Sequence, residues 1–242
     1  MKAVLRFGTL LVLAVLALQL YFAGRIALMA LIAPQSTTFQ RSEAWRLAIE
    51  KHEILWSQDW VDDSAKSLKR AVIASEDAGF VGHGGVDWDA LEKAWERNQK
   101  AEARAEKRAS AKPAAVKPVA KVVGGSTITQ QLAKNLFLSG ERNLVRKGQE
   151  FVITLALEAL LSKRRILEIY LNNVEWGEGV FGAQAAARHY FRVDARQLSP
   201  AQAARLAVML PAPKRFEKRP ASGYVLSRAA TIEARMGAVE LP

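Results

Sequence analysis

Hydrophobic residues are arranged in two different ways along the 242-residue chain, and the first arrangement predicts a membrane helix. An uncharged apolar run extends from Phe7 to Ala23, and Arg25 separates it from a second apolar stretch, Ile26 to Ala33. A bilayer core needs about 20 apolar residues in a helix. The region 7–33 reaches this length if Arg25 extends its charged head to the interface. We therefore expect a transmembrane anchor within residues 1–35.

The charges beside the apolar run indicate its orientation. Lys2 and Arg6 precede it, which favours a cytoplasmic N-terminus and places the bulk of the chain outside the cytoplasm. A cleaved signal peptide is the competing interpretation. Because no small-x-small cleavage site follows the apolar run directly, a retained single-pass anchor is favoured.

After residue 36, apolar residues recur mainly at helical spacing, and strand signals are sparse. Much of 36–66 is predicted to be helical. One helix is expected to lead into Glu76, and a second is expected to open near Asp87. Further helices are predicted at 127–138, 143–163, 164–173, 178–191 and 199–210. The pattern thus predicts one mainly α domain over 36–242.

The charge is unevenly distributed. The chain carries a formal +11, and the segment 97–121, rich in Ala, Lys, Arg and Glu, accounts for +6 of it. Such a segment buries little surface and is predicted to be a mobile basic insert. It contains no aromatic residues to stack on bases, so a nucleic-acid partner is not expected. The absence of cysteine excludes disulfides and thiolate chemistry, and three histidines without HExxH spacing disfavour a His-built metal site.

The pair Glu76-Asp77 is the first candidate for chemistry. It follows the helical signal of 67–74 and precedes Phe80, His83 and a glycine-rich turn. A carboxylate at such a helix end, facing a cleft, can serve as a general base or acid. The alternative is that the pair merely ends the helix on its solvated side.

The second candidate is the stretch 124–135, which begins Gly-Gly-Ser-Thr. Thr127 and Gln130 have the spacing of a capping box, so a helix is predicted to start there. Its apolar stripe is Ile128, Leu132 and Leu136. Its polar stripe is Thr127, Gln130, Gln131 and Lys134, which is either a solvated surface or one wall of a cleft. A glycine-rich entry to a helix suits a phosphate, although no Walker A sequence is present.

Two further stretches carry weaker signals. Arg146 and Glu150 are one helical turn apart, which predicts either a surface ion pair or a carboxylate held by cations beside an anionic ligand. The stretch 166–177 and the small residues that follow it are interpreted as mostly structural. Asn173 and Glu175 within it are secondary candidates for a cleft.

Together, these four stretches resemble the peptidoglycan glycosyltransferases, the family that also supplies the glycosyltransferase module of bifunctional penicillin-binding proteins. The matching residues are Glu-Asp-x-x-Phe-x-x-His-x-Gly at 76–85, Gly-Gly-Ser-Thr-x-Thr-Gln-Gln-x-x-Lys-Asn at 124–135, Arg-Lys-x-x-Glu at 146–150 and Ile-Leu-Glu-x-Tyr-Leu-Asn at 166–172. No SxxK motif follows, so the chain resembles the monofunctional, membrane-anchored form over roughly 50–215.

The resemblance implies a mainly α, lysozyme-like, two-lobed domain on the outer face of the cytoplasmic (inner) membrane, with its smaller, mobile, partly apolar part touching the bilayer. The implied reaction polymerises lipid II during cell wall biogenesis. The growing chain leaves its undecaprenyl diphosphate and joins the 4-hydroxyl of the GlcNAc of lipid II, and inversion gives a β-1,4 linkage. The implied partners are lipid II, the nascent glycan strand, membrane lipids, and other cell-wall synthesis and division proteins.

The family's roles carry over to matching positions. Glu76 would be the general base, and Glu150 would assist from across the cleft. The residues implied to bind the pyrophosphate are Lys134, Arg146 and Lys147. The residues implied to line the cleft or shape the first motif are Asp77, Phe80, His83, Ser126, Thr127, Gln130, Gln131 and Asn135. The chemistry requires no cofactor, but Mg²⁺ or Mn²⁺ is compatible with it, sharing the pyrophosphate with Glu76 or Glu150.

The sequence departs from the family pattern in two places. The insert 97–121 is longer and more basic than expected, and we expect it to contact anionic lipid headgroups. Gly79 stands where the family often has a larger residue. Two alternatives stay open from the residues alone: a lytic enzyme on the same kind of fold, which would not need the Lys134, Arg146 and Lys147 cluster, and an inactive membrane-anchored wall scaffold.

Overall fold

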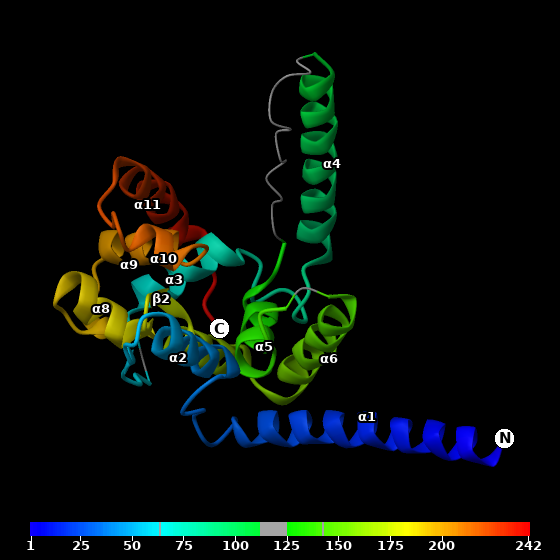
Figure 1. The fold of residues 1–242 in the computed structure, drawn as a ribbon. Helices are drawn as coiled ribbons and strands as arrows, with labels where there is room; N and C mark the ends of the chain where they lie inside the picture. The colour runs from blue at the N-terminus through cyan, green and yellow to red at the C-terminus, as the bar shows by residue number, and fades with distance from the viewer. Residues whose placement is uncertain (63, 112–124, 142) are drawn as a thin grey trace.

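Helices make up most of the protein, as the sequence predicted (Figure 1). The computed structural model describes residues 1–62, 64–111, 125–141 and 143–242. Its α-helices are α1 (Lys2–Leu28), α2 (Thr38–Glu50), α3 (Lys66–Glu76), α4 (Trp88–Ala111), α5 (Ile128–Phe137), α6 (Leu144–Leu160), α7 (Lys163–Asn173), α8 (Ala183–Phe191), α9 (Pro200–Met209), α10 (Pro213–Phe216) and α11 (Gly223–Arg235). Two short 3-10 turns are η1 (Ala195–Gln197) and η2 (Met236–Ala238).

A small sheet interrupts the helices where the sequence predicted a helix from residue 178. Strand β3 (Val180–Phe181) pairs in parallel with β1 (Ser57–Gln58) and antiparallel with β2 (Glu175–Gly177). Gly179 and Gly182 adopt φ values of +71° and +81°, a region that favours glycine. A Cβ on Gly182 would lie 2.6 Å from the carbonyl oxygen of Asn172. The predicted helix therefore begins only at Ala183.

Side-chain caps fix where the helices of the site begin. The Thr127 hydroxyl accepts the Gln130 N–H at 3.2 Å, and the Gln130 side chain accepts the Thr127 N–H at 3.1 Å. This is the capping box that the sequence predicted, and it starts α5. Asn143 and Ser162 accept backbone N–H groups at the starts of α6 and α7. The join between those two helices thus falls at 161–162, slightly before its predicted position.

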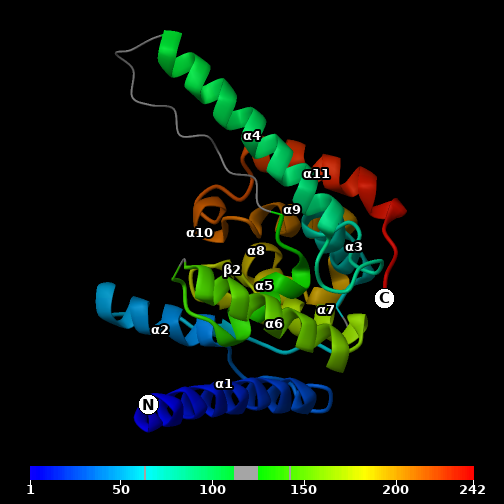
Figure 2. The same cartoon turned by 90° about the vertical axis from the view of Figure 1, so that its right-hand side faces the viewer.

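The core lies between two groups of helices. Helix α3 packs against α9 and α11, while α5 packs against α2, α6 and α7 (Figures 1 and 2). Trp176, Tyr170 and Phe80 are the largest fully buried side chains. The predicted apolar stripe of α5 is also buried, because Ile128, Leu132 and Leu136 are at most 4% exposed. The polar stripe is not uniformly solvated: Thr127 and Gln130 are buried, Gln131 is half-buried and Lys134 is exposed.

The last third of α1 belongs to the packed domain. Both views show α1 alongside the domain near α6. The side chains of Gln19 and Gln149 exchange two hydrogen bonds of 2.9 Å each, and Ile26 is completely buried. The carbonyl oxygen of Met29 accepts a 2.8 Å hydrogen bond from Arg165. Among the described residues, α1 is the one helix long and apolar enough to cross a membrane.

Helix α4 projects away from the rest of the domain (Figure 1). Its first turns carry three exposed apolar side chains, Trp88, Leu91 and Trp95. The insert predicted over 97–121 begins inside this helix, which continues to Ala111. The part of the prediction that concerns 112–121 lies outside the described residues.

Candidate active site

Glu76 is the last residue of α3, where the chain leaves helical geometry at Asp77. One oxygen of its carboxylate, Oε2, accepts a 3.1 Å hydrogen bond from Gln131 Nε2. The other, Oε1, accepts a 3.2 Å bond from the hydroxyl of Ser75. Burial raises the pKa of Glu76, and the neighbouring Asp77 charge adds to this, while the two hydrogen bonds act in the opposite direction. A partly buried carboxylate of raised pKa is suited to take a proton near neutral pH.

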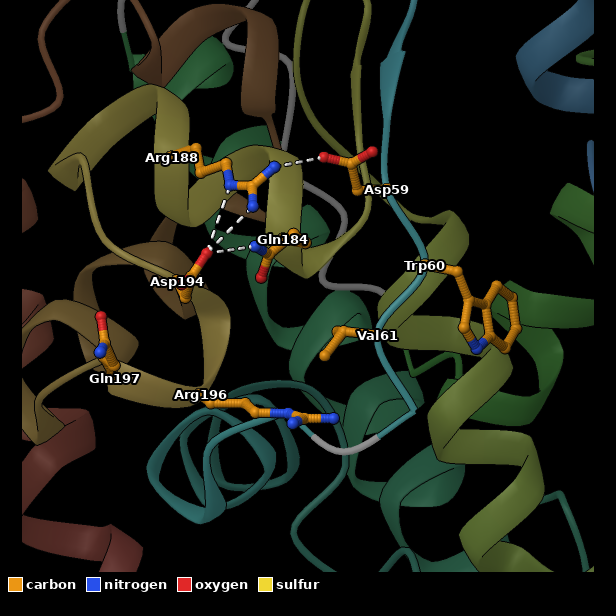
Figure 3. A pocket seen from close by; sticks show the side chains of 8 residues that line it. All are labelled: Asp59, Trp60, Val61, Gln184, Arg188, Asp194, Arg196 and Gln197. Carbon is orange, nitrogen blue, oxygen red and sulfur yellow. Dashed lines mark hydrogen bonds and ion pairs between the residues drawn. The ribbon is translucent and has the colours of Figure 1, made fainter.

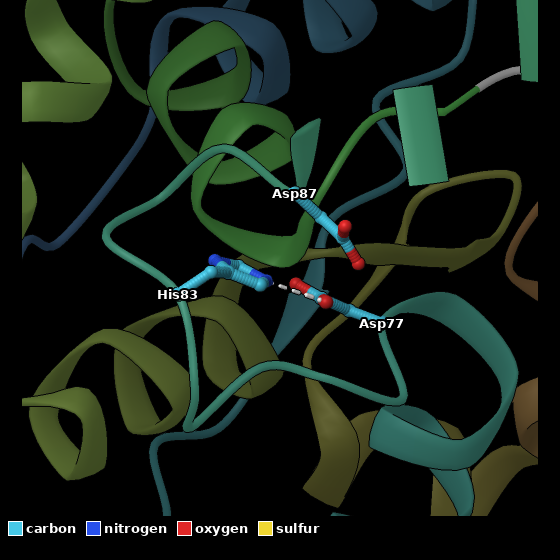
Figure 4. Close-up of side chains that lie close together, drawn as sticks. All are labelled: Asp77, His83 and Asp87. Atoms are coloured by element: carbon cyan, nitrogen blue, oxygen red, sulfur yellow. Dashed lines mark hydrogen bonds and ion pairs between the residues drawn. The ribbon is translucent and has the colours of Figure 1, made fainter. Parts of the chain in front are cut away.

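Asp77 links the first motif to the second, and its contact with His83 is drawn in Figure 4. Its Oδ2 accepts the backbone N–H of Ile128 at 3.0 Å, in the first turn of α5, where a negative charge stabilises the helix. Its Oδ1 lies 2.8 Å from His83 Nε2. Because His83 Nδ1 accepts the N–H of Gly85, the hydrogen-bond pattern assigns the imidazole proton to Nε2. Asp77 thus holds the Glu76 loop against the start of α5.

A second contact clamps the same loop. The Thr127 hydroxyl donates a 2.6 Å hydrogen bond to the carbonyl oxygen of Gly85. Gly85 has a φ of +89°, and a Cβ there would lie 2.7 Å from Thr154 Cγ2. Phe80 is fully buried and Asp77 nearly so. The structure therefore places Asp77 and Phe80 behind the site, where they support it, rather than on a surface open to substrate.

A cationic pocket of about 300 Å³ lies between α5 and the start of α6. Glu150 is buried in its wall, bonded to Arg146 at 3.0 Å and to Lys147. The predicted ion pair therefore exists, and it sits in a pocket. The lining residues are Phe39, Ser126, Gln130, Gln131, Lys134, Asn135, Leu138, Ser139, Gly140, Arg146, Lys147 and Glu150.

Gln131 joins the two halves of the site. It lines the cationic pocket and also donates to Glu76, so one side chain connects the carboxylate to the pocket. The secondary candidates Asn173 and Glu175 are not in the lining of this pocket, and both are buried. Sequence reasoning missed Phe39 and residues 138–140, which approach the pocket from α2 and from the loop after α5. It also treated Tyr170 as structural.

The carboxylates of the site are each engaged by hydrogen-bond donors of the protein. Among the described residues, Asp77, His83 and Asp87 form one group whose ligand atoms lie within 4.8 Å of each other (Figure 4). Asp77 and His83 are engaged by the bonds given above, and Asp87 caps α4 through the N–H of Ala90. The oxygens of Glu76 and Glu150 likewise have protein donors. The residues present thus fit a site that neutralises an anion with Lys and Arg.

A larger cavity of about 500 Å³ lies elsewhere, among residues of α8 and the segments near η1 and β1 (Figure 3). Its charged groups largely satisfy one another. Arg188 bonds Asp59 at 2.7 Å and Asp194 at 3.2 Å. Hydrogen bonds from Gln184 and Arg188 hold the pKa of Asp194 below its usual value. An acid of lowered pKa is a poor proton acceptor at neutral pH, so the base candidate remains Glu76.

Comparison with known proteins identifies the family of the chain. The sequence model of the family described as Transglycosylase matches residues 46–237. The chain is 49% identical over 238 residues to a biosynthetic peptidoglycan transglycosylase of Paraburkholderia phytofirmans, covering 97% of this chain and 92% of the relative. A protein of the same name from Burkholderia pseudomallei is 52% identical over 229 residues, covering 94% of this chain and 83% of the relative. The chain therefore belongs to the transglycosylase family.

Proposed function

We propose that this protein is the peptidoglycan glycan-strand polymerase that its family membership indicates, acting on lipid II. The observation that carries the proposal is the position of Gln131, which lines the cationic pocket and bonds the Glu76 carboxylate. This bond connects the proposed general base to a pocket whose cations suit a diphosphate. A lytic enzyme would need the acid but not the cations, because its substrate has no pyrophosphate.

Glu76 takes the proton in the proposed reaction. The 4-hydroxyl of the acceptor GlcNAc gives its proton to Glu76 while its oxygen forms a bond to the anomeric carbon of the donor. Burial raises the pKa of Glu76 and so strengthens it as a base. The side chain is only partly buried, so the proton can pass to solvent before the next addition.

The cationic pocket receives the leaving group. As the bond from the anomeric carbon to the phosphate oxygen breaks, its electron pair moves onto the undecaprenyl diphosphate. Lys134, Arg146 and Lys147 supply fixed positive charge for the developing anion. Glu150 holds the latter two in place through the bonds described above, which fits a positioning role. The anomeric carbon passes through an oxocarbenium-like state, and attack from the opposite face gives the inverted β-1,4 product.

The N-terminal helix is consistent with membrane anchoring. We propose that its N-terminus is cytoplasmic and that the catalytic domain lies on the extracytoplasmic face, where a lipid-linked donor presents its sugars. The basic residues of the insert that lie in α4, such as Arg97 and Lys100, are proposed to contact anionic lipid headgroups.

The deciding experiment is lipid II polymerisation by the wild type and Glu76→Gln, each with and without a divalent cation. We expect Glu76→Gln to abolish strand growth and to keep the melting temperature of the wild type. The matched control is Glu178→Gln, an acid outside the pocket that pairs with Arg46 and Lys51, and it should polymerise normally.

Three results, from this experiment and from a parallel assay on isolated cell wall, would change the proposal. A normal rate for Glu76→Gln would remove the base assignment. Release of soluble fragments from isolated cell wall, without strand growth from lipid II, would indicate the lytic alternative. Polymerisation only in the presence of the cation would show that Lys and Arg are insufficient for the diphosphate.

A further inference from the structure

Tyr170 lies beneath the proposed base, in the middle of α7. Its side chain is 1% exposed, and its hydroxyl donates a 2.9 Å hydrogen bond to Oε1 of Gln131. The Nε2 of the same amide donates to Glu76 at 3.1 Å. A continuous chain of hydrogen bonds therefore runs from the core of the domain to the carboxylate.

We propose that Tyr170 is a positioning residue for the transfer reaction, which fixes the orientation of the Gln131 amide so that its N–H groups face Glu76. This inference rests on the proposed role of Glu76 as the base. It adds a residue from the fourth motif to a site otherwise built from the first three.

The donor-to-acceptor direction of these hydrogen bonds is fixed by the groups at their two ends, Tyr170 and Glu76. An ionised carboxylate only accepts hydrogen bonds, so Gln131 must present Nε2 to Glu76. A Gln amide turned by 180° would place Oε1 against the carboxylate instead. Burial and the nearby charges of Glu76 and Asp77 hold the pKa of Tyr170 well above its usual value, so the phenol stays protonated and remains a donor. A donor at this position selects the one orientation of the amide that serves the base.

The Gln131 amide makes one further, longer hydrogen bond in the same orientation. Gln131 Nε2 lies 3.5 Å from the carbonyl oxygen of Ser126, at the exposed edge of the pocket. Without the phenol, Oε1 of Gln131 loses its donor, and the amide can turn away from Glu76 toward water. Glu76 would then keep only the hydroxyl of Ser75 as a hydrogen-bond donor.

Loss of the Gln131 bond would change the acidity of Glu76. Hydrogen bonds to the charged form of a carboxylate lower its pKa, and Gln131 is the stronger of the two donors acting on Glu76 in this way. Removing Tyr170 should therefore raise the pKa of Glu76 further and leave less of it ionised near neutral pH. The acidic limb of the pH–rate profile reports this directly.

The test is the pH profile of kcat/KM for lipid II polymerisation by Tyr170→Phe. We expect the acidic limb of the profile to shift to higher pH by about 0.5 to 1 unit. At a fixed pH below the limb, this shift lowers kcat/KM about three- to tenfold. The rate on the alkaline plateau should change little. Tyr190→Phe is the matched control, because it removes one buried hydroxyl bond, to the carbonyl oxygen of Trp176, away from Glu76. It should leave the limb in place.

A double-mutant cycle separates positioning from a general loss of stability. If Tyr170 acts only through Gln131, then Tyr170→Phe should have no further effect on the limb in a Gln131→Ala background. Gln131→Ala alone should move the limb in the same direction, which keeps the proposal testable even if Tyr170→Phe fails to fold. If the acidic limb stays in place in Tyr170→Phe or in Gln131→Ala while Glu76→Gln is inactive, the role of Tyr170 is refuted and the base assignment stands. An active Glu76→Gln would instead refute the base assignment on which it rests.

Discussion

Asp77→Asn is expected to destabilise the domain at the junction of its first two motifs. The native carboxylate accepts from two donors, the backbone N–H of Ile128 and Nε2 of His83. Asparagine offers one oxygen acceptor and one NH₂ donor. If its oxygen stays on Ile128, its NH₂ group faces His83 Nε2–H. The imidazole cannot relieve this by changing tautomer, because its Nδ1 would then face the N–H of Gly85.

The magnitude follows from the interactions that are lost. A hydrogen bond to a charged group contributes about 1.5–3 kcal/mol, and a charge at a helix N-terminus adds about 0.3–1 kcal/mol when exposed and up to about 2 when partly buried. Since asparagine keeps a neutral version of the cap, we expect a net loss of about 2–3 kcal/mol. For a domain of this size, each kcal/mol lowers the melting temperature by about 2–4 °C. The melting temperature should therefore fall by about 4–12 °C.

The assay is thermal unfolding of the detergent-solubilised protein at pH 7.5, followed by circular dichroism. Asp87→Asn is the control, because it alters a single helix cap in the same loop, at the N–H of Ala90. It should cost about 1 kcal/mol or less. If Asp77→Asn melts within 1 °C of the wild type, the carboxylate does not hold the two motifs together, and this account of the loop is refuted.

Two further predictions concern one buried and one half-buried polar contact outside the cleft. Burial raises the pKa of Glu175 to about 7, so the free energy of unfolding of the wild type falls by up to about 3 kcal/mol as the pH rises from 4.5 to 7. The melting temperature of Glu175→Gln, measured relative to that of the wild type, should therefore rise over this pH range and then level off. A difference in melting temperature that stays constant with pH would contradict the prediction. Gln149→Leu leaves Gln19 without its hydrogen-bond partner in an apolar helix and should lower the free energy of unfolding by about 1 kcal/mol. The double variant Gln149→Leu with Gln19→Leu should recover this stability in thermal melts. Additive losses from the two substitutions would contradict the paired arrangement.

Local signals made much of the fold predictable. The Thr127–Gln130 capping box and the stripe of Ile128, Leu132 and Leu136 act within one helix, and the structure shows both as the sequence indicated. The helix predicted from residue 178 was wrong in its first turn. There, pairing of Val180 and Phe181 with a segment more than a hundred residues earlier overrides local spacing. Such long-range pairing leaves almost no trace in a strand of two residues.

The same distinction between local and long-range contacts separates the parts of the site that the sequence could predict from those that it could not. The sequence identified the polar stripe of α5 and the Arg146–Glu150 turn, because both are periodic features of single helices. It did not identify the contact of Asp77 with Ile128 or of Tyr170 with Gln131, which join residues 51 and 39 positions apart. A tyrosine among apolar residues on a helix gives the same pattern whether its hydroxyl is idle or directs an active-site amide.

Packing against α6 fixes the position of α1, the proposed membrane helix, relative to the domain. A helix rises 1.5 Å per residue, and the bonds at Gln19 and Met29 fix its axial position against the domain at two points. With α1 in the bilayer as proposed, the residues of α1 that lie in the hydrocarbon set the distance from the bilayer to the cleft. This follows because the two contacts join α1 directly to the domain. If one helical turn were added between Gln19 and Met29, the helix could keep only one of the two contacts. A turn added before Gln19 would preserve both contacts and leave the cleft at the same distance from its lipid-linked substrate.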